Sequence, residues 1–152
     1  MAELRSAHLF SITLTVGEVQ PLGKTPFGDR RVAVVEGGHF EGARLKGTVL
    51  KGGTDWLLLR NDGALRLDVR LTLKTDDGAI IGMTYCGYRH GPAAVIDQLN
   101  RGERVDPAQY YFRAAPFFET SSEKYGWLNR IIAVATGDRR PEGPVYDVFE
   151  VL

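Results

Sequence analysis

Hydrophobic and polar residues alternate along most of this chain, which is the pattern of a strand that buries one face and exposes the other. The alternation is clearest in residues 65–74, where aliphatic side chains at odd positions alternate with charged or hydroxylated ones. Such a strand is typical of an antiparallel sheet with one face on a core. By the same pattern we predict strands over residues 9–16, 31–35, 43–50, 56–60, 64–75, 79–90, 110–120, 130–136 and 145–152.

Short runs of Gly, Asn, Asp and Pro separate the predicted strands. Residues 61–63 (Asn-Asp-Gly) and 76–78 (Asp-Asp-Gly) predict hairpin turns, because Asn and Asp tolerate the left-handed backbone conformation and Gly adopts it freely. The glycine pairs at 37–38 and 52–53 predict turns or bulges, and residues 141–144 predict the last turn. So many turns in a chain of this length favour β structure.

One segment departs from the alternating pattern and predicts a single short helix near residues 92–101. Val95, Ile96 and Leu99 recur there at helical spacing, and the segment lies between Gly91-Pro92 and Gly102. We expect this helix to cover one end or one seam of the sheet. Pro116 has no amide proton to donate, so it predicts an edge, a bulge or a kink within the strand at 110–120.

These elements predict an all-β fold with one domain over residues 1–152. Strands at this spacing with one helix exclude a parallel sheet built from βαβ units and leave a sandwich or a closed barrel. We favour a single closed antiparallel β-barrel of about nine or ten strands, because long consecutive hairpins form such barrels. Closure also removes the strand edges that would otherwise be exposed.

The composition and the first residues of the chain limit which partners and which cellular location we expect for the protein. Nineteen basic and nineteen acidic residues cancel, so no strong field attracts nucleic acid, and no apolar run approaches the ~20 residues that span a membrane. The first residues lack the pattern of a signal peptide, and the lone Cys86 cannot form an internal disulfide. We therefore predict a cytoplasmic protein that binds neither nucleic acid nor membrane.

No motif for a metal or a cofactor is present in the sequence. The three histidines, His8, His39 and His90, are far apart and lack the spacing of metal ligands. The phosphate loop, the dinucleotide fingerprint and the nucleophile elbow are also missing. We predict no metal site and no cofactor.

Aromatic residues concentrate between positions 85 and 127, where nine of them occur. Large rings with polar groups suit a pocket for a flat or apolar ligand, and they equally suit a barrel whose interior is filled by its own side chains. From the alternation in 110–120 we predict that Phe112, Phe118 and Thr120 face inward. Tyr85 joins them as a candidate ligand-binding residue.

Asp68 and Arg70 are the sharpest polar candidates, on the polar face of the strand at 64–75. If this face lines a cavity, Asp68 is a carboxylate able to accept a proton and Arg70 a ligand-binding group. The alternative is that both side chains belong to a solvated outer surface.

Further candidates lie where strands begin or end. Asp55 and Trp56 follow a glycine pair, and Trp127 and Asn129 precede a strand, so we predict ligand contacts at the barrel rims. The alternative is that Asp55 and Asn129 bond to turn backbone and the tryptophans plug the ends.

His39 and Glu41 flank Phe40 and therefore share one face of an extended segment. In that position they could act together as an acid and base pair. The alternative is that Glu41 accepts hydrogen bonds from turn amides near residues 37 and 38.

A set of short motifs resembles domain-of-unknown-function family 3237: GGHFEG at 37–42, GGTDW at 52–56, TDDGA at 75–79, YYFR at 110–113, FET at 118–120 and WLNR at 127–130. The resemblance covers residues 10–151. It implies a compact antiparallel β-barrel with a central cavity, often an oligomer, and no agreed activity. It also implies an Asp at position 68, whereas His39 departs from the expected pattern.

Three functional hypotheses follow. The first is a barrel that binds a small aromatic or cyclic molecule and acts without a cofactor as an isomerase, cyclase or lyase, with Asp68, Glu41, His39 or a tyrosine moving the proton. The second is a carrier or sensor with the same pocket. The third is a structural or partner-binding barrel with a filled core. A homo-oligomer is compatible with all three.

Overall fold

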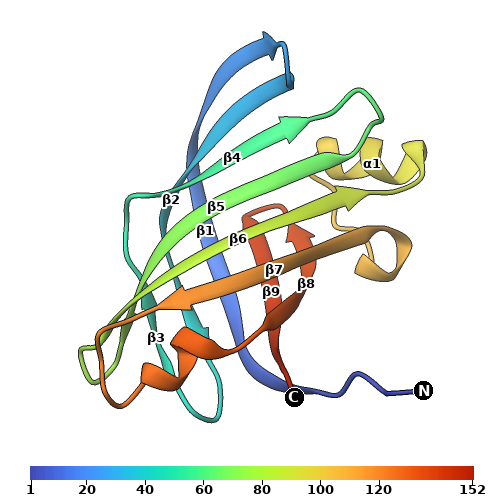
Figure 1. Cartoon of the computed structure of the whole chain (residues 1–152). Coiled ribbons are helices and arrows are strands. Elements are labelled where there is room, and N and C mark those ends of the chain that lie inside the picture. The colour runs from blue at the N-terminus through green and yellow to red at the C-terminus, as the bar shows by residue number, and fades with distance from the viewer.

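Antiparallel β-strands make up most of the computed structural model, which describes all of residues 1–152. One α-helix, α1 (Ala93–Asn100), and two 3₁₀ turns, η1 (Pro107–Gln109) and η2 (Gly126–Arg130), complete the fold (Figure 1). The nine strands are β1 (Ser6–Thr25), β2 (Gly28–Glu41), β3 (Lys46–Val49), β4 (Gly53–Leu59), β5 (Leu65–Thr75), β6 (Ile80–His90), β7 (Tyr111–Glu119), β8 (Ala133–Arg140) and β9 (Gly143–Val151).

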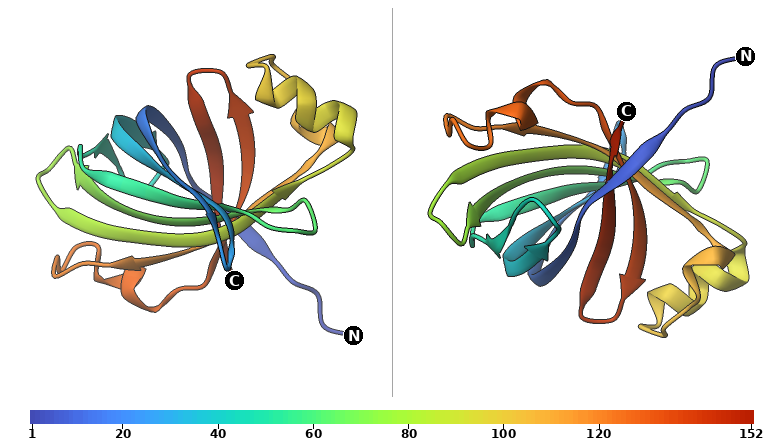
Figure 2. Two further views of the ribbon diagram at one scale, coloured as in Figure 1. Left: turned by 90° about the horizontal axis from the view of Figure 1, so that it is seen from above. Right: turned by 90° about the horizontal axis from the view of Figure 1, so that it is seen from below.

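The sheet closes on itself as a ring. Going round, each strand pairs with its neighbour in the order β1, β9, β8, β7, β6, β5, and β1 pairs with β2 to complete the circuit. Both β3 and β4 lie between β2 and β5 and pair with both of them. β3 pairs with residues 38–41 of β2, and β4 pairs with residues 29–35 of β2. The predicted all-β, barrel-like fold with one short helix is therefore confirmed, and Figure 2 shows the strong twist of its strands from both ends.

Alternation fixes which side chains fill the interior. In β5 the aliphatic residues are buried, while the charged face is partly or fully exposed. One end of the ring is packed solid by aromatic side chains: the ring centroids of Phe10 and Phe40 are 5.4 Å apart, and those of Phe10 and Phe118 5.9 Å. Ile81, Met83 and Leu128 are fully buried in the same core cluster.

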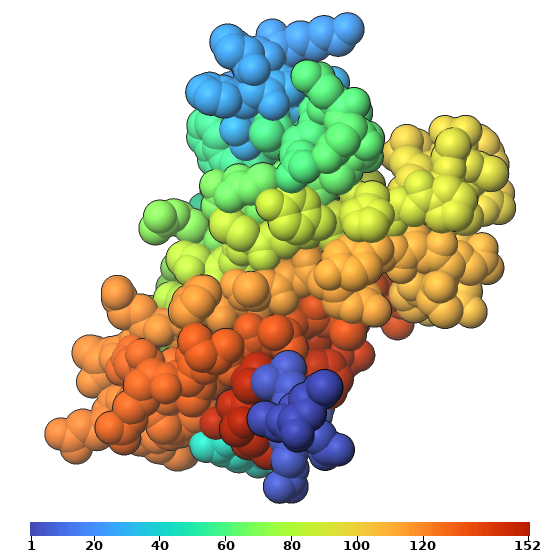
Figure 3. All heavy atoms as spheres, turned by 45° about the vertical axis from the view of Figure 1, so that its right-hand side comes forward, coloured from blue at the N-terminus to red at the C-terminus, as the bar shows by residue number.

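The first hairpin is longer than the sequence predicted. β1 continues past Val16 to Thr25 and β2 begins at Gly28, so an arm of two strands projects from one end of the molecule (Figure 3). The glycines at 37–38 do not end β2. They follow a bulge, because Thr15 pairs with Gly37 and Val16 pairs with Val35, which leaves Glu36 without a partner.

Pro116 does not shift the register of β7, whose pairing with β6 is continuous from Tyr111 to Glu119. β7 pairs with β8 only through Arg113 and Ala114, so β7 behaves as an edge where Pro116 lies. An edge is where a strand tolerates a proline.

The short helix and the chain ends lie at opposite ends of the ring. α1 and the β8–β9 hairpin lie beside one another in both views of Figure 2, whereas the N- and C-termini meet at the far end, where Ser6 pairs with Val151. None of the helices has the length and apolar character needed to cross a lipid bilayer.

Candidate functional site

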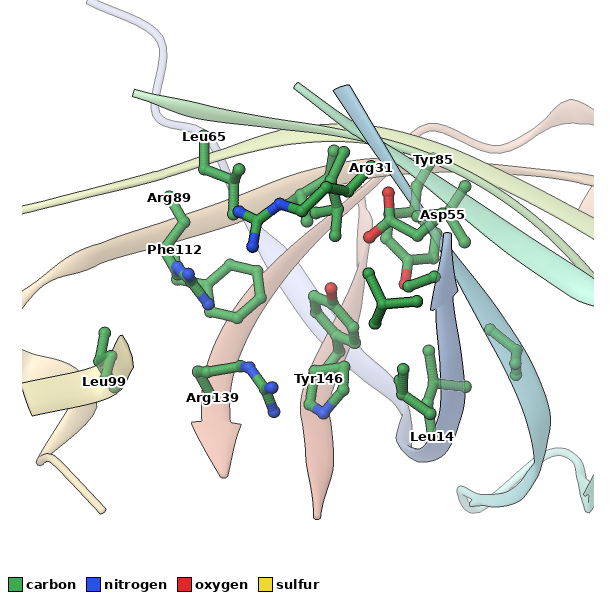
Figure 4. A pocket seen from close by; sticks show the side chains of 18 of the residues that line it. Leu14, Arg31, Asp55, Leu65, Tyr85, Arg89, Leu99, Phe112, Arg139 and Tyr146 are labelled. Carbon is green, nitrogen blue, oxygen red and sulfur yellow. The ribbon is translucent and has the colours of Figure 1, made fainter. Parts of the chain in front are cut away.

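A cavity of about 240 Å³ occupies the end of the ring next to α1 (Figure 4). Its wall is mostly apolar and is built from inward-facing residues of eight strands and the helix, which include Leu14, Val35, Leu67 and Leu99. The mouth is marked by lining residues that are themselves exposed, Val19 on the projecting arm and Asn100 at the end of α1. The packed aromatic end of the ring forms the floor.

Asp55 is the one carboxyl side chain in the cavity wall. It lies on β4 opposite Val69 of β5, on the side of the strand that faces inward. Its Oδ1 accepts a hydrogen bond from the backbone amide of Asp68 at 3.2 Å. Burial raises the pKa of Asp55 to about 7, with a smaller contribution from the Asp68 carboxylate, while that amide and Arg89 oppose the rise. A carboxyl of this kind exchanges its proton near neutral pH.

Two tyrosines continue the polar part of the wall. The rings of Tyr85 and Tyr146 meet edge to face with centroids 5.1 Å apart, and Phe112 meets Tyr146 in the same way at 5.2 Å. Both phenols are fully buried, which raises the pKa of Tyr85 and of Tyr146 above the ordinary value. They therefore stay protonated at neutral pH and act as hydroxyl groups that donate or accept hydrogen bonds.

Three arginines complete the polar set: Arg31 from β2, Arg89 from β6 and Arg139 from β8. In the view of Figure 4 their guanidinium groups lie on one side of the cavity and the Asp55 carboxyl on the other, with the Tyr146 hydroxyl between. Burial lowers the pKa of Arg89, and the charges of Arg139 and Arg31 lower it further. Arginine nevertheless remains charged under ordinary conditions.

The structure brings three of the predicted site residues to this cavity: Asp55, Tyr85 and Phe112. Asp55 was predicted at a rim, and the structure instead places it within the strand, facing the interior. Trp56, the next residue, therefore faces outward and is 46% exposed.

The predicted catalytic residues lie outside the cavity. Asp68 and Arg70 occupy the outer face of β5, where the Asp68 side chain is 49% exposed, so the solvated-surface alternative describes them. His39 and Glu41 do share a face, as predicted, but it is the exposed outer face of β2, and only Phe40 between them points inward.

The remaining predicted residues lie at the opposite, packed end. Phe118 faces inward as expected but packs against Phe10. Thr120 lies past the end of β7, where its amide donates to Asn129 Oδ1 at 2.8 Å and its carbonyl accepts from Asn129 Nδ2 at 2.9 Å. Trp127 stacks under Arg44, whose Cζ is 3.6 Å from the ring centroid. For Asn129 the structure supports the alternative of turn backbone bonding.

Sequence reasoning missed Arg31, Arg89, Arg139 and Tyr146. A usable signal was present, because each of these residues continues the alternation of inward-facing positions along its own strand. Arg89 follows Met83, Tyr85 and Gly87 at intervals of two. When a charged residue near the end of a strand occupies a position that the alternation assigns to the buried face, it indicates a polar cavity wall.

The fold and this cavity define a class of protein: a small ring of antiparallel strands, packed at one end and hollow at the other. The family model described as "Protein of unknown function (DUF3237)" matches residues 4–151. The chain belongs to this family, as its motifs indicated.

Relatives and solved structures agree with this assignment. UPF0311 protein RPA1785 of Rhodopseudomonas palustris is 36% identical over 149 residues, which cover 98% of this chain and 97% of the relative. Its crystal structure matches with a TM-score of 0.93, at 35% identity, over 100% of this chain and 99% of that one. A β-barrel-like protein of Acinetobacter baumannii matches with a TM-score of 0.87, at 38% identity, over 100% and 98% of the two chains.

One relative carries the name of an activity. Hydroalkoxylation enzyme phnH of Penicillium herquei is 31% identical over 128 residues, which cover 84% of this chain and 70% of the relative. A solved structure of an enzyme from Penicillium herquei matches with a TM-score of 0.76, at 28% identity, over 100% of this chain and 97% of that one.

Proposed function

We propose that this protein binds a small aromatic or cyclic molecule in the cavity beside α1 and catalyses proton transfer on it without a cofactor, as an isomerase or cyclase. The observation that carries the proposal is Asp55, a carboxyl in an apolar wall with its pKa raised to about 7 by burial. Asp55 thereby replaces Asp68, Glu41 and His39 as the proposed catalytic residue, because those three side chains lie on the outer surface.

Proton-transfer catalysis is most effective when the pKa of the acid or base lies near the working pH. At neutral pH the Asp55 carboxyl is present in both its protonated and its ionised form, so one group can donate a proton and take one back. The rings of Tyr85, Phe112 and Tyr146 provide flat apolar surfaces that hold a cyclic substrate against it.

The name of the Penicillium herquei relative supports this chemistry. Hydroalkoxylation is the addition of an O–H group across a carbon–carbon double bond. In one molecule that bears both groups, the neutral Asp55 carboxyl donates its proton to one alkene carbon while the substrate oxygen bonds to the other. The hydroxyl proton then returns to the Asp55 carboxylate. A C–O and a C–H bond form, a π bond and an O–H bond break, and the ring closure consumes nothing else.

The test is turnover of a panel of ortho-alkenylphenols in D₂O, followed by mass spectrometry and NMR. The wild-type protein should form the cyclic ether with one deuterium on the carbon that was protonated. The Asp55→Asn variant should lose at least about 100-fold in rate, since general acid–base groups contribute about 10²–10⁴. The Asp68→Asn variant is the comparison, because it removes a carboxyl from the opposite face of the same strand pair.

Loss of turnover in Asp68→Asn with full activity in Asp55→Asn would return the catalytic role to Asp68. Binding of the phenols without turnover in the wild-type protein would contradict catalysis and favour the carrier or sensor. An open cavity counts against the filled-core alternative. The cytoplasmic location and the homo-oligomer stay predictions.

A further inference from the structure

The three cavity arginines carry more positive charge than the protein around them balances. None of the ion pairs of the structure includes Arg31, Arg89 or Arg139. The Nε atoms of Arg31 and Arg89 are buried and have no hydrogen-bond partner. Arg139 is partly satisfied, because its Nη1 donates to the carbonyl of Arg140. Two guanidinium groups in the wall are therefore left with unused donors.

Nearby carboxyl groups do not neutralise this charge. Asp55 is the single carboxyl that lines the cavity, and near neutral pH it is only partly ionised. Asp138, next to Arg139 in the chain, is paired instead with Arg140 at 2.9 Å and Arg104 at 3.8 Å. Buried charges without partners are costly, so a site that keeps them is built for a partner that arrives from outside.

We propose that the ligand of this cavity carries a planar oxyanion, a carboxylate or a phenolate on an aromatic or cyclic skeleton, bound by Arg31 and Arg89 with Arg139 beside them. A planar guanidinium presents paired N–H donors that match a carboxylate or a delocalised oxyanion in geometry as well as in charge. This inference rests on the proposed function, because it names the substrate class of the same cavity.

The arrangement also orients such a ligand for the proposed chemistry. With the oxyanion on the side of the guanidinium groups, the ring lies against Phe112 and Tyr146 and its far edge points to Asp55 (Figure 4). The guanidinium groups hold the oxygen in its ionised form, in which it is nucleophilic, so its proton is released to solvent and not directly to Asp55. Asp55 delivers its own proton to carbon and regains one from water, so the overall exchange of a π bond and an O–H bond for a C–O and a C–H bond is unchanged. The two halves of the cavity thus separate the anion from the acid.

The experiment compares carboxylates with amides of the same shape, by titration calorimetry at pH 6. The probes are benzoate and benzamide, cinnamate and cinnamamide, and 2-naphthoate and 2-naphthamide. We expect the wild-type protein to bind the carboxylate at least 10-fold more tightly than its amide in at least one pair. The Arg31→Met and Arg89→Met variants should each weaken carboxylate binding at least 10-fold and change amide binding less than 3-fold.

The matched control is Arg130→Met, which removes an exposed arginine of η2 that forms no ion pair and lies at the other end of the ring. It should bind every probe as the wild-type protein does. If either cavity variant fails to fold by circular dichroism, the comparison of carboxylate with amide in the wild-type protein still decides. Equal or weaker binding of the carboxylates, or no binding of any probe, overturns the inference.

The two proposals fail separately. Asp55→Asn should keep its preference for carboxylates while it loses turnover, so unchanged turnover in that variant contradicts the proposed function alone. Conversely, Asp55-dependent turnover in a protein that does not prefer carboxylates contradicts only the inference that the ligand carries an oxyanion.

Discussion

Asp55 of β4 and Asp68 of β5 lie on paired strands, and Asp55 is opposite Val69, the neighbour of Asp68. The two carboxyl groups nevertheless have different surroundings. The Asp68 side chain points to solvent and is 49% exposed, whereas Asp55 points into an apolar cavity. Water stabilises the first carboxylate, and the second has one backbone amide as its hydrogen-bond donor. The pKa of about 7 for Asp55 follows from this difference in position.

The pKa of Asp55 predicts how stability depends on pH. The folded protein holds this proton more tightly than the unfolded chain, whose Asp has a pKa near 3.8, so this contribution to stability is complete below about pH 4 and is lost as the pH rises through 7. At about 1.4 kcal/mol for each tenfold change in proton affinity, the loss is roughly 4 kcal/mol. Asp55→Asn should abolish it. Urea unfolding of both proteins from pH 4 to pH 8 measures the difference, and a difference that stays constant would contradict the assignment.

At the scale of elements, the packing of the cavity wall depends on where a strand contributes a small residue. Gly137 of β8 lies opposite Tyr146 of β9, and the Phe112 ring of β7 covers it. A Cβ atom at position 137 would lie 2.6 Å from Cγ of Phe112. The missing side chain is what allows Phe112 to reach Tyr146 across the wall.

We therefore expect Gly137→Ala to displace the Phe112 ring. Overpacking a buried site typically costs about 1–3 kcal/mol in the free energy of unfolding, and the displaced ring should also weaken binding of the aromatic probes. Gly126→Ala in η2 is the control, because nothing lies within 4 Å of a Cβ atom there. Thermal denaturation and probe affinity measure both effects. Equal stability of Gly137→Ala and the wild-type protein would show that the ring does not need this space.

The molecule as a whole divides its interior between a packed half and a hollow half. The packed half contains Phe10, Phe40 and Phe118 and supplies buried apolar area, which drives folding. The hollow half costs stability, because its polar side chains are poorly satisfied and side chains do not fill its space. A ligand that fills the hollow half should therefore raise the melting temperature.

This division predicts how a larger side chain in the cavity wall changes the stabilisation by a ligand. In the wild-type protein, 2-naphthoate at 100 times its Kd should stabilise the fold by about 2.7 kcal/mol, or roughly 5 to 10 °C in Tm. Ala33→Leu adds bulk at a buried residue of the cavity wall and should remove most of this shift. Val34→Leu, the next residue on the outer face of β2, should keep it. An undiminished shift in Ala33→Leu would place the ligand elsewhere.

The sequence by itself determined the strands, the short helix and the ring. Alternation, turn residues and the spacing of Val95, Ile96 and Leu99 are local properties, and they agree with the fold along nearly the whole chain. It also gave the correct parity in β7, where Phe112 and Phe118 both face inward. The length of the first hairpin escaped prediction, because residues 17–30 carry little alternation.

Only the tertiary structure decided which end of the ring is hollow. Phe112 and Phe118 have the same parity, but one lines a cavity and the other packs against Phe10, since that depends on residues distant in the chain. The same holds for Asp55 and Asp68, whose faces are set by register against neighbouring strands. Parity is a property of one strand, whereas a cavity and the charge within it are made where several strands meet.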